Sequence, residues 1–188
     1  MSGAMPAATP EFSRILRINE LGDGARERHI EASAEERAAL ARRFGLRTLD
    51  VLEARLHVVP EAGGARVEGQ LVADLVQACV ATAEDVPAHI DIPFAVRFMR
   101  GLDDESADAP DEEIELSEAD CDLLPLENER IDLGETIAQT LALNLDPYPR
   151  APDADAALRA MGVVSEEEAG PFAALKGLKL GREGKDRG

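Results

Sequence analysis

A two-residue alternation of apolar and polar side chains in the middle of the chain constrains its fold more than any other feature. It occupies three stretches, residues 48–59, 66–71 and 89–98. Alternation of this kind is typical of strands with one buried and one solvated face. The loop from Pro60 to Gly64 has hairpin length, so the first two stretches are expected to pair as a hairpin. Pro93 cannot donate to a ladder, which places the third stretch at a sheet edge or a bulge.

Two further expectations concern the strands. Apolar character continues from Leu71 through Val80, which is long for one strand, and this predicts a bend or bulge near residues 73–77. Residues 11–18 suit a first strand that joins the same sheet.

The first predicted helix is defined by its ends. Ser33 and Glu36 form a capping-box pattern, and the segment between Ala34 and Phe44 is rich in good helix formers. Gly45 then supplies the C-terminal cap. We therefore expect a helix of about three turns here.

The second predicted helix begins after Asp132, with Glu135 placed to complete a capping box. Pro147 and Pro149 bias the residues before them away from helical dihedrals, so this helix is expected to end near Asp146. A rigid exit should follow as far as Pro152. The apolar stripe that would face the core comprises Leu133, Ile137, Ala138, Leu141 and Leu145.

These patterns predict an α+β fold with a mainly antiparallel sheet or a small β-barrel, flanked by two main helices. We expect a disordered leader at residues 1–10, a single α+β domain at 11–152 and an extended C-terminal tail at 153–188. Within the domain, residues 101–120 contain ten acidic residues and no basic one, which predicts an exposed acidic loop.

The charge of the chain limits its partners. Asp and Glu number 38 against 20 Lys and Arg, a formal net charge of −18, so general binding to nucleic acid or anionic membrane is disfavoured and basic proteins are favoured. The chain has few aromatic side chains on which nucleic-acid bases could stack, with five Phe, one Tyr and no Trp. The segment 176–188 reverses sign, with five Lys or Arg against two acids, and is the one basic element available for phosphate.

The candidate catalytic and metal-binding side chains are few. His29, His57 and His89 are scattered and fall on or near the polar side of predicted strands, which indicates surface histidines. Cys79 is expected to be a small buried thiol, and Cys121 follows the acidic loop without metal-site spacing. No catalytic residue, cofactor or metal site is therefore assigned. Two distant cysteines and no secretory or membrane-spanning stretch indicate a cytoplasmic protein.

Three segments occur in a characteristic order. They are the strand pair 67–98, the segment 129–133 with its helix and Pro149-Arg150 exit, and the motif Pro171-Phe172-Ala173-Ala174-Leu175-Lys176-Gly177-Leu178-Lys179. In this order, over roughly residues 10 to 180, the chain resembles the YceD family, also called the large ribosomal RNA subunit accumulation protein family.

The resemblance implies a noncatalytic, bacterial, cytoplasmic factor in large ribosomal subunit biogenesis that supports 23S rRNA accumulation or processing. Family members often carry a Cys-x-x-Cys motif that suggests metal, but Thr82 replaces the second cysteine here, so no metal role is carried over. The implied partner is a large-subunit ribosomal protein or the 23S rRNA precursor. The residues taken as partner-binding are Asp132, Pro149, Arg150, Pro171, Phe172, Leu175, Lys176, Leu178 and Lys179.

Some alternatives stay open at this point. The segment 171–179 either docks back onto its own domain or binds a partner. The whole protein is alternatively a metal-dependent hydrolase acting on RNA through Cys79, a histidine and loop carboxylates. A third hypothesis is an acidic chaperone for a basic protein.

Overall fold

The computed structural model describes residues 10–22, 24–101 and 122–163. Residues 1–9 of the predicted leader, nearly all of the acidic loop and residues 164–188 of the predicted tail lie outside the described residues. Those predictions therefore stay predictions.

The main sheet is an open, five-stranded sheet with the order β2-β3-β4-β5-β6. All neighbours are antiparallel except β5 and β6, which are parallel. Within the described residues the sheet ends at β2 and β6, which do not pair with each other, so the small β-barrel left open by the sequence is wrong and the mainly antiparallel sheet is confirmed. The strands are β2 (Arg26–Glu31), β3 (Thr48–Glu61), β4 (Gly64–Ala78), β5 (Asp85–Met99) and β6 (Asp122–Pro125).

The predicted hairpin is the centre of this sheet. β3 and β4 pair antiparallel from Thr48 with Val76 to Glu61 with Gly64, and the turn has Gly63 at a φ of +84°. Such a positive φ favours glycine.

The predicted bend in residues 73–77 is wrong. β4 runs unbroken over 15 residues, and the register shift lies in β3, between Leu49 and Val51. Leu49 pairs with Leu75 and Val51 with Asp74, so Asp50 is an extra residue on β3, as in a β-bulge.

The edge position predicted from Pro93 holds for only part of β5, because β6 is the edge strand of the sheet. β6 pairs only with the stretch of β5 from Val96 to Met99, which leaves residues 85–95 as an open edge.

The first strand does not join the main sheet as predicted. β1 (Ile15–Arg17) instead pairs antiparallel with β7 (Arg130–Asp132) in a separate two-stranded sheet. A 3₁₀ turn, η1 (Ile18–Glu20), follows β1.

Helix α1 (Ala34–Phe44) confirms the first helix prediction in full. The Ser33 hydroxyl and the Glu36 side chain form both bonds of the capping box, and Gly45 closes the helix at a φ of +67°. Leu40 is completely buried, and α1 packs on β3.

Helix α2 (Leu133–Leu143) starts where predicted but ends earlier. Asn144 closes it, with its side-chain amide donating to the Thr140 carbonyl, so the end near Asp146 is wrong by about one turn. The Asp132 cap is present, whereas the Glu135 carboxylate binds Arg43 of α1 in place of closing a capping box.

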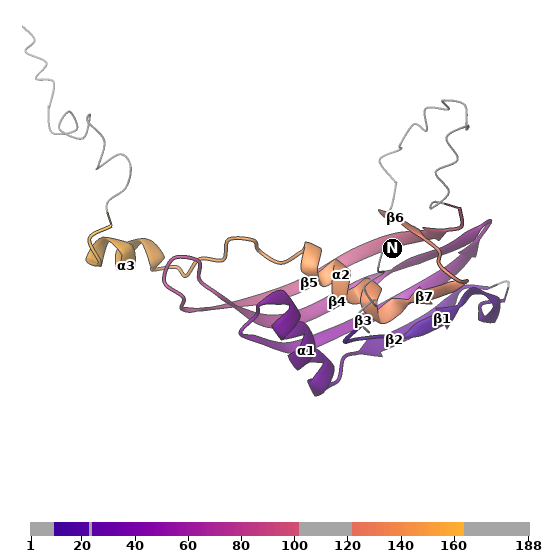
Figure 1. Cartoon of the computed structure of the whole chain (residues 1–188), viewed down its shortest axis with the longest axis horizontal. Coiled ribbons are helices and arrows are strands. Elements are labelled where there is room, and N and C mark those ends of the chain that lie inside the picture. Colours follow the sequence, from indigo (N-terminus) through magenta and orange to yellow (C-terminus); the bar gives the residue numbers. More distant parts are fainter. Residues whose placement is uncertain (1–9, 23, 102–121, 164–188) are drawn as a thin grey trace, which may run out of the picture.

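The main hydrophobic core lies between the sheet and the helices α1 and α2. Figure 1 shows α1 and α2 over the same face of the sheet, with the short helix α3 (Ala154–Ala160) beyond one end. The α2 stripe is confirmed, because Leu133, Ile137, Ala138 and Leu141 are at most 3% exposed and Leu145 packs on the same cluster. The opposite sheet face carries polar side chains.

Candidate functional site

Asp132 ties the N-terminal segment to the start of α2. Its Oδ1 accepts hydrogen bonds from the backbone N–H of Gly134 at 3.0 Å, Glu135 at 3.2 Å and Arg14 at 2.7 Å. Its Oδ2 accepts one from the Ser13 hydroxyl at 2.5 Å. Because both oxygens are engaged within the domain, Asp132 has a structural role, and its partner-binding role stays a prediction.

Two arginines bind α1 to its surroundings. The Arg14 guanidinium donates to both carboxylate oxygens of Glu36, and this bond is the main reason that the pKa of Glu36 is lowered to about 2. Arg43 donates to both oxygens of Glu135 on α2 and to Glu11. The two helices are therefore joined by a bidentate ion pair.

The exit after α2 is held against the turn between β4 and β5. The Pro149 carbonyl accepts from the Val80 N–H at 2.9 Å, and the Ala151 N–H donates to the Cys79 sulfur at 3.3 Å. The exit is thus docked on the domain. Arg150 donates to Asp155 of α3 at 2.5 Å.

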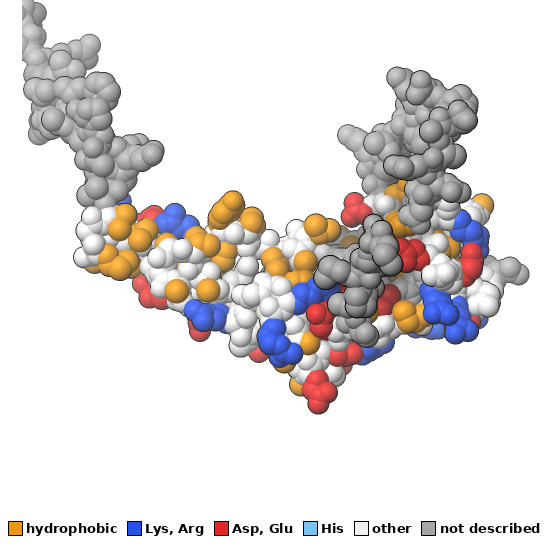
Figure 2. All heavy atoms as spheres, in the orientation of Figure 1, with side chains coloured by type: hydrophobic (Ala, Val, Ile, Leu, Met, Phe, Trp, Pro, Cys, Tyr) orange, Lys and Arg blue, Asp and Glu red, His pale blue; other side chains and the backbone are white. Residues whose placement is uncertain are grey.

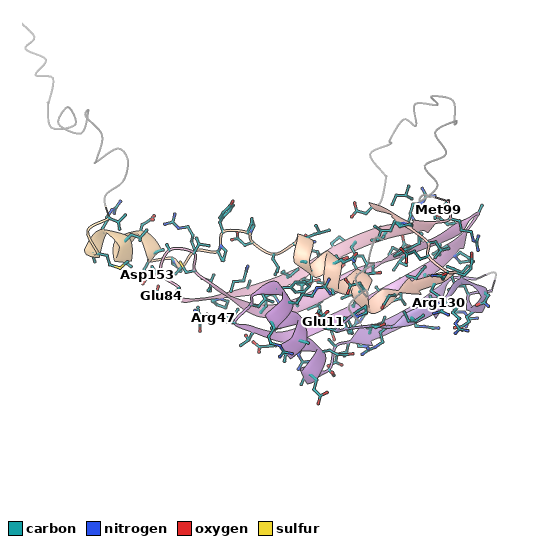
Figure 3. All side chains as sticks on the ribbon, in the orientation of Figure 1. Glu11, Arg47, Glu84, Met99, Arg130 and Asp153 are labelled. Atoms are coloured by element: carbon teal, nitrogen blue, oxygen red, sulfur yellow. The ribbon has the colours of Figure 1, made fainter. Side chains whose placement is uncertain are left out.

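The three predicted partner-binding residues that the structure describes do not form one cluster. Asp132 and the Pro149-Arg150 pair lie beyond opposite ends of α2. Figure 3 shows the labelled Arg130 and Asp153, which flank these positions in sequence, toward opposite ends of the molecule. The other six predicted residues lie outside the described part of the chain: Pro171, Phe172, Leu175, Lys176, Leu178 and Lys179.

Cys79 confirms the prediction of a buried thiol, since it is 3% exposed, although it lies one residue past β4. The Thr82 hydroxyl, followed by the Ala151 N–H, lowers the pKa of its thiol to about 7. The Thr82 hydroxyl itself donates to the Glu84 carboxylate at 2.9 Å. Within the described residues, no three His, Cys, Asp or Glu side chains gather as metal ligands, so these residues do not fit a metal centre at Cys79.

The three histidines lie on the polar face of the sheet, as predicted. Each is more than half exposed and has a carboxylate neighbour. Such pairs are common on solvated surfaces and contribute little to stability. The pairs and their N···O distances are His29–Glu53 at 3.4 Å, His57–Glu27 at 3.8 Å and His89–Asp74 at 2.6 Å.

A groove between α2 and β6 was missed by the sequence reasoning. Two pockets of about 370 and 260 Å³ adjoin one another there, because both are lined by Leu124, Thr136 and Gln139. Figure 1 shows α2 and β6 side by side. Leu143, an apolar residue outside the core stripe of α2, was the available signal. We call this feature the α2–β6 groove; its remaining lining residues are Ile15, Val96, Phe98, Asp122, Leu123, Pro125, Glu127, Asn128, Arg130, Asp132, Glu135, Thr140 and Leu143.

Among the described helices, none has the length and apolar character that crossing a bilayer requires.

Comparisons with known proteins give one match. The family model of the large ribosomal RNA subunit accumulation protein YceD matches residues 67–179, more than half of the chain. This range starts later than the resemblance expected from the sequence, since it begins in β4 and leaves out β1 to β3 and α1. Comparisons with curated proteins and with solved structures gave no significant match. The matched range holds β4 to β7, α2, the docked exit and α3, and the chain therefore belongs to the YceD family.

Proposed function

We propose that this protein is a noncatalytic factor in large ribosomal subunit biogenesis, which supports the accumulation or processing of 23S rRNA in the bacterial cytoplasm. The family match is the single observation that carries this proposal, because the family is described by its role in large ribosomal RNA subunit accumulation. The proposed contact is a large-subunit ribosomal protein or the rRNA precursor itself.

The charge of the chain supports a basic protein as the first of these partners. A net charge of −18 repels phosphate over about a Debye length, roughly 8–10 Å at physiological salt. Ribosomal proteins that bind rRNA carry the opposite charge and are attracted by the same field. The basic segment 176–188 is the part of the chain that would contact RNA.

The arrangement of the candidate catalytic groups supports a noncatalytic role over the metal-dependent hydrolase. That alternative requires Cys79, a histidine and carboxylates to converge. Among the described residues, Cys79 instead packs in a small cluster with Ala151 and Ala154, whereas His29, His57 and His89 all lie on the polar face of the sheet.

Sedimentation of a lysate that contains the tagged full-length chain tests the proposal. We expect the protein to co-migrate with immature large-subunit particles, and its depletion to lower mature 23S rRNA. Migration only as a free small protein, together with unchanged 23S rRNA on depletion, would contradict the proposal.

Two additions to this experiment separate the alternatives. Deletion of residues 176–188 should weaken association with the particles if the basic tail contacts RNA, and unchanged co-sedimentation would remove that contact. A complex that survives complete RNA digestion indicates contact with protein alone, as the acidic chaperone requires. Stoichiometric metal in the purified protein would favour the hydrolase.

A further inference from the structure

The α2–β6 groove exposes large apolar side chains on several of its walls. Ile15, Leu123 and Leu143 are 55%, 51% and 77% exposed, and all three line the groove. Large apolar residues grouped around one groove mark interaction sites more often than single exposed leucines do.

These side chains are outside the core that holds α2 in place. Leu133, Ile137 and Leu141 face the sheet and are at most 3% exposed, whereas Leu143 lies outward in the last turn. The hydroxyls of Thr136 and Thr140, on the groove side of α2, donate to carbonyls within the helix at 2.8 Å. On the α2 side the groove is lined by Leu143 and by polar residues, of which the Thr136 and Thr140 hydroxyls are already hydrogen-bonded. Its apolar lining comes mainly from β5 and β6.

The groove is also acidic. Its lining includes four carboxylates against one guanidinium, that of Arg130. Asp132 and Glu135 are engaged within the domain, while Asp122 and Glu127 are exposed on the β6 side.

Two arginine side chains near the groove already form ion pairs with carboxylates. Arg43 is bound by Glu135 and Glu11, and Arg100 by Glu129. A ligand of this groove therefore meets an apolar floor and a negative rim.

We propose that the α2–β6 groove binds a basic amphipathic helical segment of a partner protein. The apolar face of such a helix fits between Leu123 and Leu143, and its lysine or arginine side chains meet Asp122 and Glu127. Nucleic acid is disfavoured in the same place, since the rim carboxylates repel phosphate. This inference names the class of partner for the proposed function and rests on that function for its cellular relevance.

Three synthetic peptides of equal length test the inference with the purified full-length chain. The first is a helix-forming peptide with leucines on one face and lysines on the other. The second replaces every lysine with glutamate, and the third keeps the composition of the first but scrambles it so that no apolar face forms. Fluorescence anisotropy should show binding of the first peptide only, with an affinity that falls as salt rises.

The substitutions compare two exposed apolar surfaces of the same protein. The test variant is Leu123→Ser with Leu143→Ser, and we expect it to bind the first peptide about tenfold more weakly or worse. The matched control is Met161→Ser with Val163→Ser, where the native side chains are 65% and 51% exposed at the α3 end. Figure 2 shows hydrophobic side chains gathered around α3, so the control surface is also apolar.

A second pair of variants tests the charge of the rim. Asp122→Asn with Glu127→Gln should reduce both the affinity and its salt dependence. Glu20→Gln with Asp153→Asn, which neutralises two exposed carboxylates outside the groove lining, should change neither by more than about twofold.

Several outcomes would overturn the inference. Equal binding of the scrambled peptide would mean that charge alone attracts the peptide. Equal losses of peptide affinity in the Leu123/Leu143 and Met161/Val163 variants would mean that the peptide does not bind specifically at the groove. Deletion of residues 164–188 should leave the affinity unchanged. Tighter binding after this deletion would show that the chain's own C-terminal segment occupies the groove.

A complementation experiment separates this inference from the proposed function. If the wild-type chain restores 23S rRNA in depleted cells and the Leu123/Leu143 variant does not, both are supported. If both chains restore 23S rRNA equally, the groove has no part in the proposed function, and the proposed function is still supported. If depletion has no effect on 23S rRNA, the proposed function is wrong, and peptide binding by the groove is judged in vitro alone.

Discussion

The Ser13 hydroxyl donates a hydrogen bond of 2.5 Å to the carboxylate of Asp132, 119 positions further along the chain. The same carboxylate accepts the Arg14 N–H and caps α2. One side chain therefore fixes the N-terminal segment, β7 and the start of α2 relative to one another.

Asp132→Ala should destabilise the protein by about 2–3 kcal/mol, since it removes a helix cap and leaves partly buried donors without their charged acceptor. Asp132→Asn keeps one acceptor oxygen and should cost less. Urea unfolding measures both. Asp153→Ala is the control, because Asp153 precedes α3 without a side-chain capping bond and should change stability by less than about 0.5 kcal/mol. Equal effects at the two aspartates would refute the role given to Asp132.

Gly134→Ala should also destabilise the protein, although alanine is normally favoured over glycine in a helix by about 1 kcal/mol. A Cβ at Gly134 would lie 2.6 Å from the Phe12 carbonyl oxygen and 3.0 Å from the Ser13 Cα, so the N-terminal segment must shift. We expect a loss of about 1–3 kcal/mol in urea unfolding. At Gly24 a Cβ meets no described atom within 4 Å, and Gly24→Ala is the matched control. A stabilised Gly134→Ala protein would show that this close approach is absent.

Glu36→Gln should lower the free energy of unfolding at neutral pH by about 1 kcal/mol. It should also reduce the change of that free energy with pH under acidic conditions. The folded-state pKa of Glu36 is about 2 against an ordinary 4.5, chiefly because Arg14 hydrogen-bonds to the carboxylate. A lowered folded-state pKa gives stabilisation that is complete above the unfolded pKa and is lost as the pH falls from about 4.5 toward about 2. Thermal unfolding across this window measures the loss in wild type. Glu35→Gln removes the same charge from the same helix turn and should keep the wild-type pH profile in this window.

Cys79 should titrate near pH 7, well below an ordinary thiol, because the neighbouring Thr82 hydroxyl and the Ala151 N–H, which donates to the sulfur at 3.3 Å, lower the pKa of the thiol. Thiolate absorbance in the ultraviolet, recorded for a Cys121→Ser protein, gives the midpoint. Thr82→Val removes the largest cause and should raise the midpoint. Thr48→Val, which removes a hydroxyl that donates to Asp50, should leave the midpoint unchanged. A midpoint that is the same with and without the Thr82 hydroxyl would disprove this cause.

Leu143→Ser and Ile137→Ala should differ sharply in stability, although both residues are apolar and lie in α2. Ile137 is fully buried, and its truncation should cost about 2–5 kcal/mol. Leu143 is 77% exposed, so its loss should stay within about 0.5 kcal/mol. Chemical unfolding of the two variants checks this. A large loss for Leu143→Ser would mean that the groove wall is part of the core.

Features that depend on neighbouring residues were predictable. The capping box of Ser33 and Glu36 and the C-terminal glycine of α1 need only a few consecutive residues, and the alternation in β3 and β4 identified their buried faces. The missing backbone donor of Pro93 indicated the part of β5 that β6 does not pair with. For the candidate site, the sequence predicted the surface histidines and the buried thiol, but not the groove.

Features that depend on distant residues were not predictable from local patterns. Glu135 has the spacing of a capping box, yet its carboxylate binds Arg43, which is 92 positions away and offers a bidentate charged partner. The pairing of β1 with β7 brings together segments separated by more than 110 residues. The bulge was expected in β4 and lies in β3, because either strand of a pair can accommodate an extra residue.

The sequence by itself determined the α+β class, the hairpin, the N-terminal caps of both main helices and the family. Each of these depends on the spacing of residues that are close together in the sequence, or on the order of short motifs along it. Tertiary structure alone decided that the sheet stays open, that Asp132 anchors the N-terminal segment and that Leu123 and Leu143 line one groove. The physical reason is that packing brings together residues from separate elements. A local pattern determines which face of each helix or strand is apolar. Which other element packs against that face is determined only when all elements pack together in one core.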